Sequence, residues 1–231
     1  MIKRTLLSEY EYQRVGGKRA LTLDEGDELL FVRHTTGDCE LIIATRGGLA
    51  TRFHEAEARA MGRTARGVRG ISLRGDDEVV GVAVCEKGKQ LLTITENGFG
   101  KRSDYEEFRL MKNRGGLGVA CHNITEKTGA LAAVASVKSD DDIMIITSDG
   151  VIIRTPCDGI PTYSRTAGGV IVMRLSDGVK VVTFARIESE EEIEDEIADA
   201  PADEVIADAP KMPDPDEDGA EDTDGAEEGE E

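Results

Sequence analysis

Lysine and arginine side chains recur at regular intervals along residues 1–187, and their type and spacing could bind an anion. One set ends a short β-branched stretch in each unit, at Arg4, Arg52, Arg102 and Arg154, with steps of 48, 50 and 52 residues. A second set lies in the glycine-rich segment that follows each of these stretches. Arginine offers a fork of N–H donors that matches phosphate oxygens, and glycine lets backbone N–H groups approach a ligand closely. The recurrence predicts a row of cationic patches that contacts a polyanion with regular charge spacing, and duplex DNA fits.

The predicted contact surface consists of these two sets together with the glycines and the glutamine of the first loop. Its members are Lys3, Arg4, Gln13, Arg14, Gly16, Gly17, Lys18, Arg19, Arg52, Arg59, Arg63, Arg66, Arg69, Lys101, Arg102, Lys112, Arg114, Arg154, Arg165 and Arg174. The sequence shows no helix-turn-helix, zinc-finger or aromatic RNA-binding motif. We therefore expect phosphate contact with DNA bending, and little reading of base edges.

Other residue types that could do chemistry lack the spacing that such chemistry needs. Four cysteines, none of them in a CxxC pair, are expected to be buried or part-buried free thiols: Cys39, Cys85, Cys121 and Cys157. The three histidines show no ligand spacing, and the chain has no P-loop and no convincing Ser/His/Asp arrangement. We expect no metal, no cofactor and no catalysis by this chain alone.

The elements that must position these cations form an internal repeat of about 50 residues. A glycine recurs at Gly17, Gly67, Gly118 and Gly169, with steps of 50, 51 and 51. The sequence of each unit predicts a hairpin, followed by a polar loop and further short strands. An example of the hairpin is Leu41–Thr45 and Leu49–Phe53 around a Gly-Gly turn. The last strand follows an acidic or glycine turn, at Leu29–Val32, Val79–Val84, Leu131–Val137 and Val179–Phe184.

Four strands per unit at this period predict an all-β, propeller-like pinwheel of four-stranded blades, in which stacked neighbours make the core. We place about four repeats at 1–38, 39–88, 89–139 and 140–187, and the first is incomplete because its opening strand would precede Met1. The absence of tryptophan argues against WD40 repeats. A β-helix needs shorter coils, and a helical solenoid needs apolar stripes of 3.6-residue period that residues 1–187 lack.

The acidity of the chain comes from its C-terminal segment. Residues 188–231 hold 22 Asp and Glu against one Lys, whereas residues 1–187 hold 27 Lys and Arg against 25 Asp and Glu. We expect residues 188–231 to be a disordered acidic tail, which competes with DNA for the basic surface or only keeps the chain in solution. No apolar run suits a membrane span or a secretory signal, so we expect a cytoplasmic protein.

Three segments carry a resemblance to a known family. The string Met1-Ile2-Lys3-Arg4-Thr5-Leu6-Leu7-Ser8-Glu9-Tyr10, the loop Arg59–Ile71 and the stretch Thr95–Arg102 resemble blade segments of the C-terminal DNA-wrapping domain of bacterial DNA gyrase A subunits. The family's heptapeptide QRRGGKG corresponds to residues 13–19, where Val15 stands for an arginine and Arg19 for the last glycine. The four units resemble the last four of the usual six, so we expect the chain to begin inside a longer protein.

The resemblance implies a β-pinwheel that bends or wraps double-stranded DNA around its edge and supports ATP-driven negative supercoiling. In the family, catalysis belongs to a breakage-reunion domain and to a partner ATPase subunit. The implied partners are the rest of gyrase A and the gyrase B subunit, in a nucleoid-associated heterotetramer. Two alternatives stay open: the equivalent domain of topoisomerase IV, which would bind DNA without a full chiral wrap, and a propeller whose basic rim meets an acidic protein.

Overall fold

The computed structural model describes residues 1–12 and 16–187, and this part of the chain is built from β-strands with three short 3₁₀ helices. The strands are β1 (Glu40–Thr45), β2 (Leu49–His54), β3 (Val79–Cys85), β4 (Gln90–Thr95), β5 (Phe99–Ser103), β6 (Leu110–Met111), β7 (Val119–Ala120), β8 (Leu131–Val137), β9 (Asp142–Thr147), β10 (Ile152–Pro156), β11 (Val170–Ile171) and β12 (Val181–Ile187). The helices are η1 (Leu7–Glu9), η2 (Glu55–Glu57) and η3 (Tyr105–Glu107). The all-β prediction is confirmed; the predicted disorder of residues 188–231 concerns residues outside the described part.

The predicted hairpins form where a glycine takes the third position of a short turn. β1–β2, β4–β5 and β9–β10 are antiparallel pairs. In each turn the third residue is a glycine with positive φ, namely Gly48 (76°), Gly98 (77°) and Gly150 (84°). Its N–H donates to the threonine carbonyl three residues earlier, at 2.9, 2.9 and 3.0 Å. A residue with a side chain would be strained in this left-handed conformation, so the glycine fixes the position of the turn.

The sheets do not follow the borders of the sequence repeats. The strand order is β3-β1-β2-β6, with β7 also on β2, in one sheet, and β11-β5-β4-β8 in the next. β6 and β7 belong to the third repeat but pair with β2 of the second, and β11 of the fourth repeat pairs with β5 of the third. We expected each unit to form its own blade; instead, its hairpin recruits the loop strands of the unit that follows.

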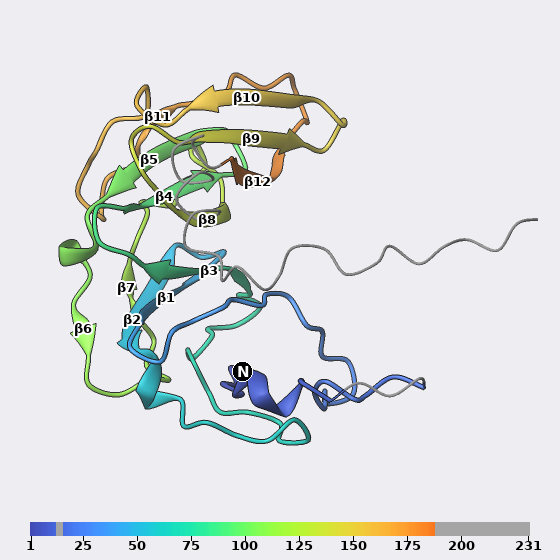
Figure 1. Ribbon diagram of the computed structural model, residues 1–231. Coiled ribbons are helices and arrows are strands. Elements are labelled where there is room, and N and C mark those ends of the chain that lie inside the picture. The colour runs from blue at the N-terminus through green and yellow to red at the C-terminus, as the bar shows by residue number, and fades with distance from the viewer. Residues whose placement is uncertain (13–15, 188–231) are drawn as a thin grey trace, which may run out of the picture. The chain divides into compact units, whose positions relative to one another are not determined.

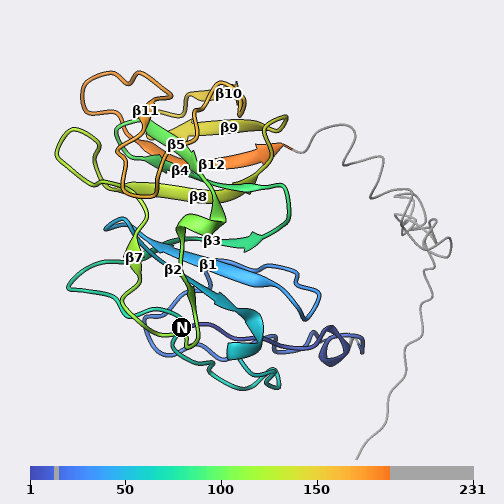
Figure 2. The ribbon, with the colours of Figure 1, turned by 90° about the vertical axis from the view of Figure 1, so that its left-hand side faces the viewer.

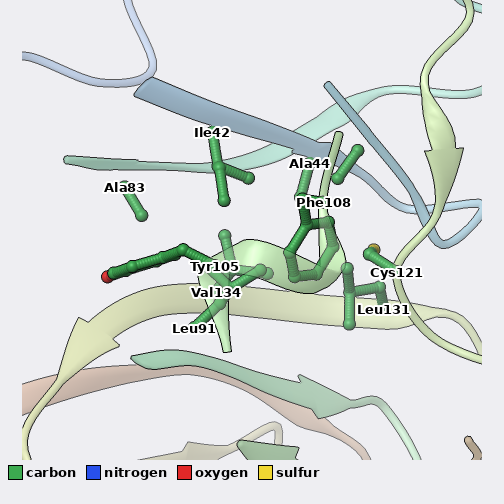
Figure 3. Close-up of a cluster of buried hydrophobic side chains, with 10 residues drawn as sticks. Ile42, Ala44, Ala83, Leu91, Tyr105, Phe108, Cys121, Leu131 and Val134 are labelled. Carbon is green, nitrogen blue, oxygen red and sulfur yellow. The ribbon is translucent and has the colours of Figure 1, made fainter. Parts of the chain in front are cut away.

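Each hydrophobic cluster lies between neighbouring repeats, because the long strands bury both of their faces. Ile42 and Ala44 of β1 pack with Leu91 and Leu131 of the next sheet, around Phe108 (Figure 3). Leu92 and Ile94 point to the opposite face and pack with Ile143 and Ile145 of the third sheet. A smaller cluster around Phe53 joins the second repeat to Ile2 of the first. The stacked sheets in Figure 1 therefore share their cores, as a repeat protein requires.

The prediction of a strand at Leu29–Val32 is wrong, because this segment has no strand assignment. The equivalent strands β3, β8 and β12 are held by β1, β4 and β9, the first strands of their hairpins. No strand of the described residues plays that part for Leu29–Val32. Without a ladder partner the segment exposes Leu29, Leu30 and Val32, although Arg33 Nε reaches the Val82 carbonyl of β3 at 3.1 Å.

Candidate nucleic-acid interface

The basic residues at the hairpin ends bind the protein's own loops. Arg52 donates through Nη1 to the carbonyl oxygens of Tyr105 and Phe108 at 2.5 and 3.3 Å, and it forms an ion pair with Glu40. Arg102 donates through Nε to the carbonyl of Ile160 at 2.7 Å. For both arginines the acceptor carbonyl groups belong to the repeat that follows in the chain. These arginines thus donate to carbonyl groups of the docked loop, and the Tyr105 carbonyl also accepts from the Phe108 N–H at 2.9 Å.

Lys101 is fully buried beside Arg102, so its ammonium group does not reach the surface that DNA would contact. Its Nζ donates to the Ser164 carbonyl at 2.7 Å and to Ser103 Oγ at 3.2 Å. Burial lowers the pKa of this lysine to about 8. The lysine therefore carries a charge inside the seam between two repeats, and we assign it a structural role.

His122 lies in the same seam and is neutral near physiological pH. Burial, and then the charge of Lys101, lowers the pKa of His122 to about 4. Its Nε2 lies 3.1 Å from the Gly168 carbonyl, which can only accept, so Nε2 carries the proton. Its Nδ1 then accepts from Thr93 Oγ1 at 3.0 Å. Each nitrogen is satisfied inside the protein, which leaves this group a packing role.

The hairpin-end cations of the first and last repeats differ from each other. Arg4 is part-buried and pairs with Glu55 at 3.4 Å. Burial alone would raise the pKa of Glu55, but hydrogen bonds from Thr35, from the Cys39 N–H and from Arg4 lower it overall. Arg154, at the equivalent position of the fourth repeat, contacts Asp142 at 2.5 Å and leaves 67% of its side chain exposed. In the described residues no loop follows to cover it.

A second group of arginines links successive loops along one side of the stack. Each arginine lies four residues before its repeat's loop glycine and donates to a carbonyl of the preceding repeat. The three bonds run from Arg63 to Arg19, from Arg114 to Arg69 and from Arg165 to Ala120, at 2.6, 2.8 and 2.9 Å. The sequence showed these arginines as loop cations, but not that they connect neighbours. The only sequence signal for these connections is that the donor arginines and the residues with the acceptor carbonyls recur with the same period of about 50 residues.

The cations that remain available on the loops are a narrower set than the sequence predicted. Of the predicted contact set, five loop cations are exposed and have no side-chain bond within the described part of the chain: Arg19, Arg59, Arg69, Lys112 and Arg174. Arg66 is also exposed but pairs with Asp24 at 2.9 Å, and Lys18 donates to the Glu9 carbonyl at 2.9 Å. Gln13 and Arg14 lie outside the described residues.

The loop strands β6, β7 and β11 lie on the same side of the stacked sheets in Figure 1; Lys112 directly follows β6, and Arg174 lies three residues after β11. Gly16 lies next to Gly17 in the first loop, and neither has an atom within 4 Å of the position that a Cβ would take. A phosphate could therefore approach the backbone there as well as the side chains. The arrangement provides cations and open glycine backbone on neighbouring loops, which is suited to a charged backbone that runs along the stack.

The remaining chemistry of the described residues is inert. All four cysteines are free; Cys121 and Cys157 are buried and Cys39 and Cys85 part-buried, which confirms that prediction. Burial raises the pKa of Cys85, Cys121 and Cys157 to about 12, so these thiols stay protonated. Within residues 1–12 and 16–187 no group of three His, Cys, Asp or Glu side chains could hold a metal ion. In the same residues no helix is long and apolar enough to cross a bilayer.

Comparison with known proteins gives the family. The model of the family described as the DNA gyrase C-terminal domain, beta-propeller, matches residues 1–36, 40–86, 89–138 and 141–188. The DNA gyrase A protein of Aminobacterium colombiense is 47% identical over 189 residues, which are 82% of this chain and 23% of that protein. The gyrase A protein of Staphylococcus epidermidis is 42% identical over 194 residues, 83% of this chain and 22% of that protein. The chain thus spans less than a quarter of the length of these relatives.

Two solved structures share the fold. The C-terminal domain of DNA topoisomerase IV superimposes with a TM-score of 0.77 at 24% identity, over 86% of this chain and 63% of that one. A DNA gyrase A C-terminal domain superimposes with a TM-score of 0.65 at 24% identity, over 75% of this chain and 59% of that one. With the match of the family model over most of residues 1–188, the chain belongs to the family of β-propeller C-terminal domains of DNA gyrase.

Proposed function

We propose that this chain binds double-stranded DNA without catalysis and bends or wraps it along the exposed cations of its loops. The observation that carries the proposal is the exposed set Arg19, Arg59, Arg69, Lys112 and Arg174, which lies on loops of all four repeats and has no partner in the described part of the chain. A polyanion that tracks successive loops would neutralise them in turn.

The gyrase relatives support a place in a type II topoisomerase. We propose that the chain acts as part of gyrase A, together with the gyrase B subunit in a heterotetramer, in the bacterial cytoplasm. In that assembly the bent DNA would serve ATP-dependent negative supercoiling, which other parts of the enzyme perform. We retain as predictions the repeat borders 1–38, 39–88, 89–139 and 140–187, and a disordered acidic tail at 188–231 that competes with DNA for the basic surface or only keeps the chain in solution.

The alternative of a topoisomerase IV domain concerns the same surface but a different DNA path. The relatives named above are gyrase proteins at 42–47% identity, whereas the likeness to topoisomerase IV at 24% identity supports the fold only. Nicked circular DNA religated with the protein separates the two. A gyrase-type chiral wrap changes the linking number of the product, whereas binding without a full wrap leaves it unchanged.

The binding proposal is tested by measuring DNA affinity as a function of salt. If the rim contacts Z phosphates, the logarithm of the binding constant falls with log salt at a slope of about −0.9Z for duplex DNA. Replacing Arg69 by Gln should weaken binding to any sequence and reduce the slope by about one phosphate. Lys87→Gln is the matched control, because Lys87 is an exposed cation in the turn between β3 and β4, outside the loops. Equal effects of the two substitutions, or an affinity independent of salt, would refute the proposal and favour a protein partner.

A further inference from the structure

One carboxylate links the second, third and fourth repeats at their hairpin turns. Glu96 is the first residue of the turn between β4 and β5, and its Oε1 accepts from Nε and Nη2 of Arg46 at 2.9 and 2.5 Å. Its Oε2 accepts from Nζ of Lys180 at 2.6 Å. Arg46 is the first residue of the equivalent turn one repeat earlier, and Lys180 directly precedes β12 of the fourth repeat. A single side chain therefore holds a cation of the preceding repeat and a cation of the following one.

This carboxylate is held more firmly than one in an ordinary surface ion pair. Its side chain is only 13% exposed, and each of its two oxygens has a cationic donor. Burial alone would raise the pKa of Glu96, but hydrogen bonds from Lys180 and Arg46 and the charges of both lower it overall, so Glu96 is ionised at neutral pH. An isolated surface ion pair contributes little to stability, whereas a network of several well-placed charges contributes more.

The same two turn residues also carry main-chain bonds between the stacked sheets. The Arg46 carbonyl accepts from the Leu131 N–H of β8 at 2.9 Å, and the Glu96 carbonyl accepts from the Val181 N–H of β12 at 2.8 Å. Figure 2 shows the sheet of β4, β5 and β8 between that of β1, β2 and β3 and that of β9, β10 and β12. Apolar side chains fill the two junctions, and apolar packing is non-directional. The ion pair beside each main-chain bond therefore adds a second directional contact, and the two together fix the angle between neighbouring sheets.

The positions of the cationic loops follow the positions of the hairpins. A Cβ added to Gly118 would collide with the backbone of Ala50, and one added to Gly169 would collide with the backbone of Gly100. The loop of the third repeat thus docks on β2, and the loop of the fourth repeat docks on β5. Any change in the step from the second hairpin to the third would move one loop relative to the other.

We propose that Glu96 is a positioning residue for DNA binding: by holding Arg46 and Lys180, it fixes the step between successive repeats and so the spacing of the cationic loops along one duplex. The inference rests on the proposed DNA binding and adds a requirement to it. A few phosphates can bind one loop whatever the step between repeats. Simultaneous contact with several loops needs the correct step, because the phosphates of a duplex have a fixed spacing.

The test is the salt dependence of binding to two duplexes, for the unmodified chain and for Glu96→Gln. A hairpin duplex of about 6 base pairs is ~20 Å long and reaches few loops, whereas a duplex of about 30 base pairs is ~100 Å long and can follow several. The slope of log affinity against log salt counts the phosphates contacted at once, at about −0.9 for each. Glu96→Gln should lose at least one phosphate, about 0.9 in slope, with the long duplex and keep the slope of the unmodified chain with the short one.

Two controls separate positioning from charge and from stability. Glu86→Gln changes the net charge by the same amount, but Glu86 pairs with Lys89 at 2.8 Å inside the turn between β3 and β4, so both slopes should stay as in the unmodified chain. In a chain that already carries Arg46→Gln and Lys180→Gln, adding Glu96→Gln should change neither slope, because the carboxylate then has neither cation to hold. Thermal melts confirm that each variant is folded at the assay temperature; partial unfolding would lower both affinities alike and leave both slopes unchanged.

Three results would overturn the proposal. If Glu96→Gln keeps the slope of the unmodified chain with the long duplex, the network does not set the spacing of the loops, although the DNA-binding proposal stands. If the slope falls equally with both duplexes, Glu96 acts within a single contact and not through the step between repeats. If the unmodified chain itself binds neither duplex, or binds without salt dependence, the DNA-binding proposal fails and this inference fails with it.

Discussion

Replacement of Lys101 by Met should remove a pH dependence of stability that this one buried ammonium group creates. Burial lowers its pKa from 10.5 to about 8 in the folded chain. Below pH 8 the lysine is charged in both folded and unfolded chains, and the folded state bears the full cost of burying that charge. Between pH 8 and 10.5 the folded chain loses this proton while the unfolded chain keeps it, so stability rises with pH.

The size of the effect follows from the shift. A drop from 10.5 to about 8 corresponds to about 3 kcal/mol between the two limits of pH. The difference in free energy of unfolding between the unmodified chain and Lys101→Met should therefore be constant up to about pH 8 and then move in favour of the unmodified chain by up to about 3 kcal/mol at pH 10.5. Below about pH 8 this difference in free energy of unfolding also includes a cost of about 1–3 kcal/mol in Lys101→Met, because the Ser164 carbonyl and Ser103 Oγ lose the lysine as hydrogen-bond donor.

Guanidinium denaturation at a series of pH values measures this difference. Subtraction is needed because the buried thiols act in the opposite direction: their pKa of about 12 exceeds the ordinary value of 9.0, so they destabilise the folded chain as pH rises through 9. The contributions of Cys85 and Cys157 cancel in the subtraction, whereas that of Cys121 does not cancel fully, because the charge of Lys101 acts to lower the pKa of this thiol. Lys87→Met, a change of the same type at an exposed lysine, should give a flat difference. A flat difference for Lys101→Met as well would refute the assignment of a buried charge.

Two further pairs of substitutions test how the loops are held. Gly118→Ala puts a methyl carbon about 2.5 Å from the Ala50 carbonyl, whereas Gly150→Ala meets open space and adds only the left-handed strain of about 1–2 kcal/mol. Gly118→Ala should therefore destabilise the fold clearly more than Gly150→Ala, which thermal melts of both variants measure. Equal losses of stability would contradict the docking contact. Arg52→Ala removes hydrogen bonds to two loop carbonyls and an ion pair, so it should lower the free energy of unfolding by about 2–3 kcal/mol. Arg154→Ala removes only an exposed ion pair and should lower it by less than about 1 kcal/mol. Denaturant titrations measure both changes, and a reversed order would count against the anchoring role of Arg52.

The repeat, the hairpins and the all-β fold could be predicted from the sequence because they depend on local signals. The turn glycines Gly48, Gly98 and Gly150 and the β-branched runs around them determine local geometry wherever they stand. The absence of a strand at Leu29–Val32 could not be predicted in the same way, since the composition of this segment is that of a strand but a strand also needs a partner. Composition alone does not tell whether a partner is present.

The sequence locates the basic residues within each repeat, but it does not show which of them bind the protein's own backbone and which face solvent. By charge and spacing, Arg52, Arg63 and Arg69 are alike in the sequence. In the structure Arg52 donates to a carbonyl of the docked loop, Arg63 donates to the loop of the preceding repeat, and Arg69 faces solvent. That division depends on which backbone carbonyl groups lie within reach of each arginine. Such groups arise from the docking of one repeat on the next, which a single repeat's sequence does not contain.

The offset between sheets and sequence repeats also bears on how such a chain can change in length. Because each complete sheet takes its hairpin from one unit and its loop strands from the next, loss or duplication of one full period of about 50 residues would leave every internal junction of the same kind. Genetic recombination at equivalent positions would then produce a hybrid sheet instead of a broken one. After any such exchange, the residues that contact each other across a junction, such as Gly118 and Ala50, must still fit together. Selection on the length of the stack can therefore act by whole periods, while selection on its stability acts on the junctions.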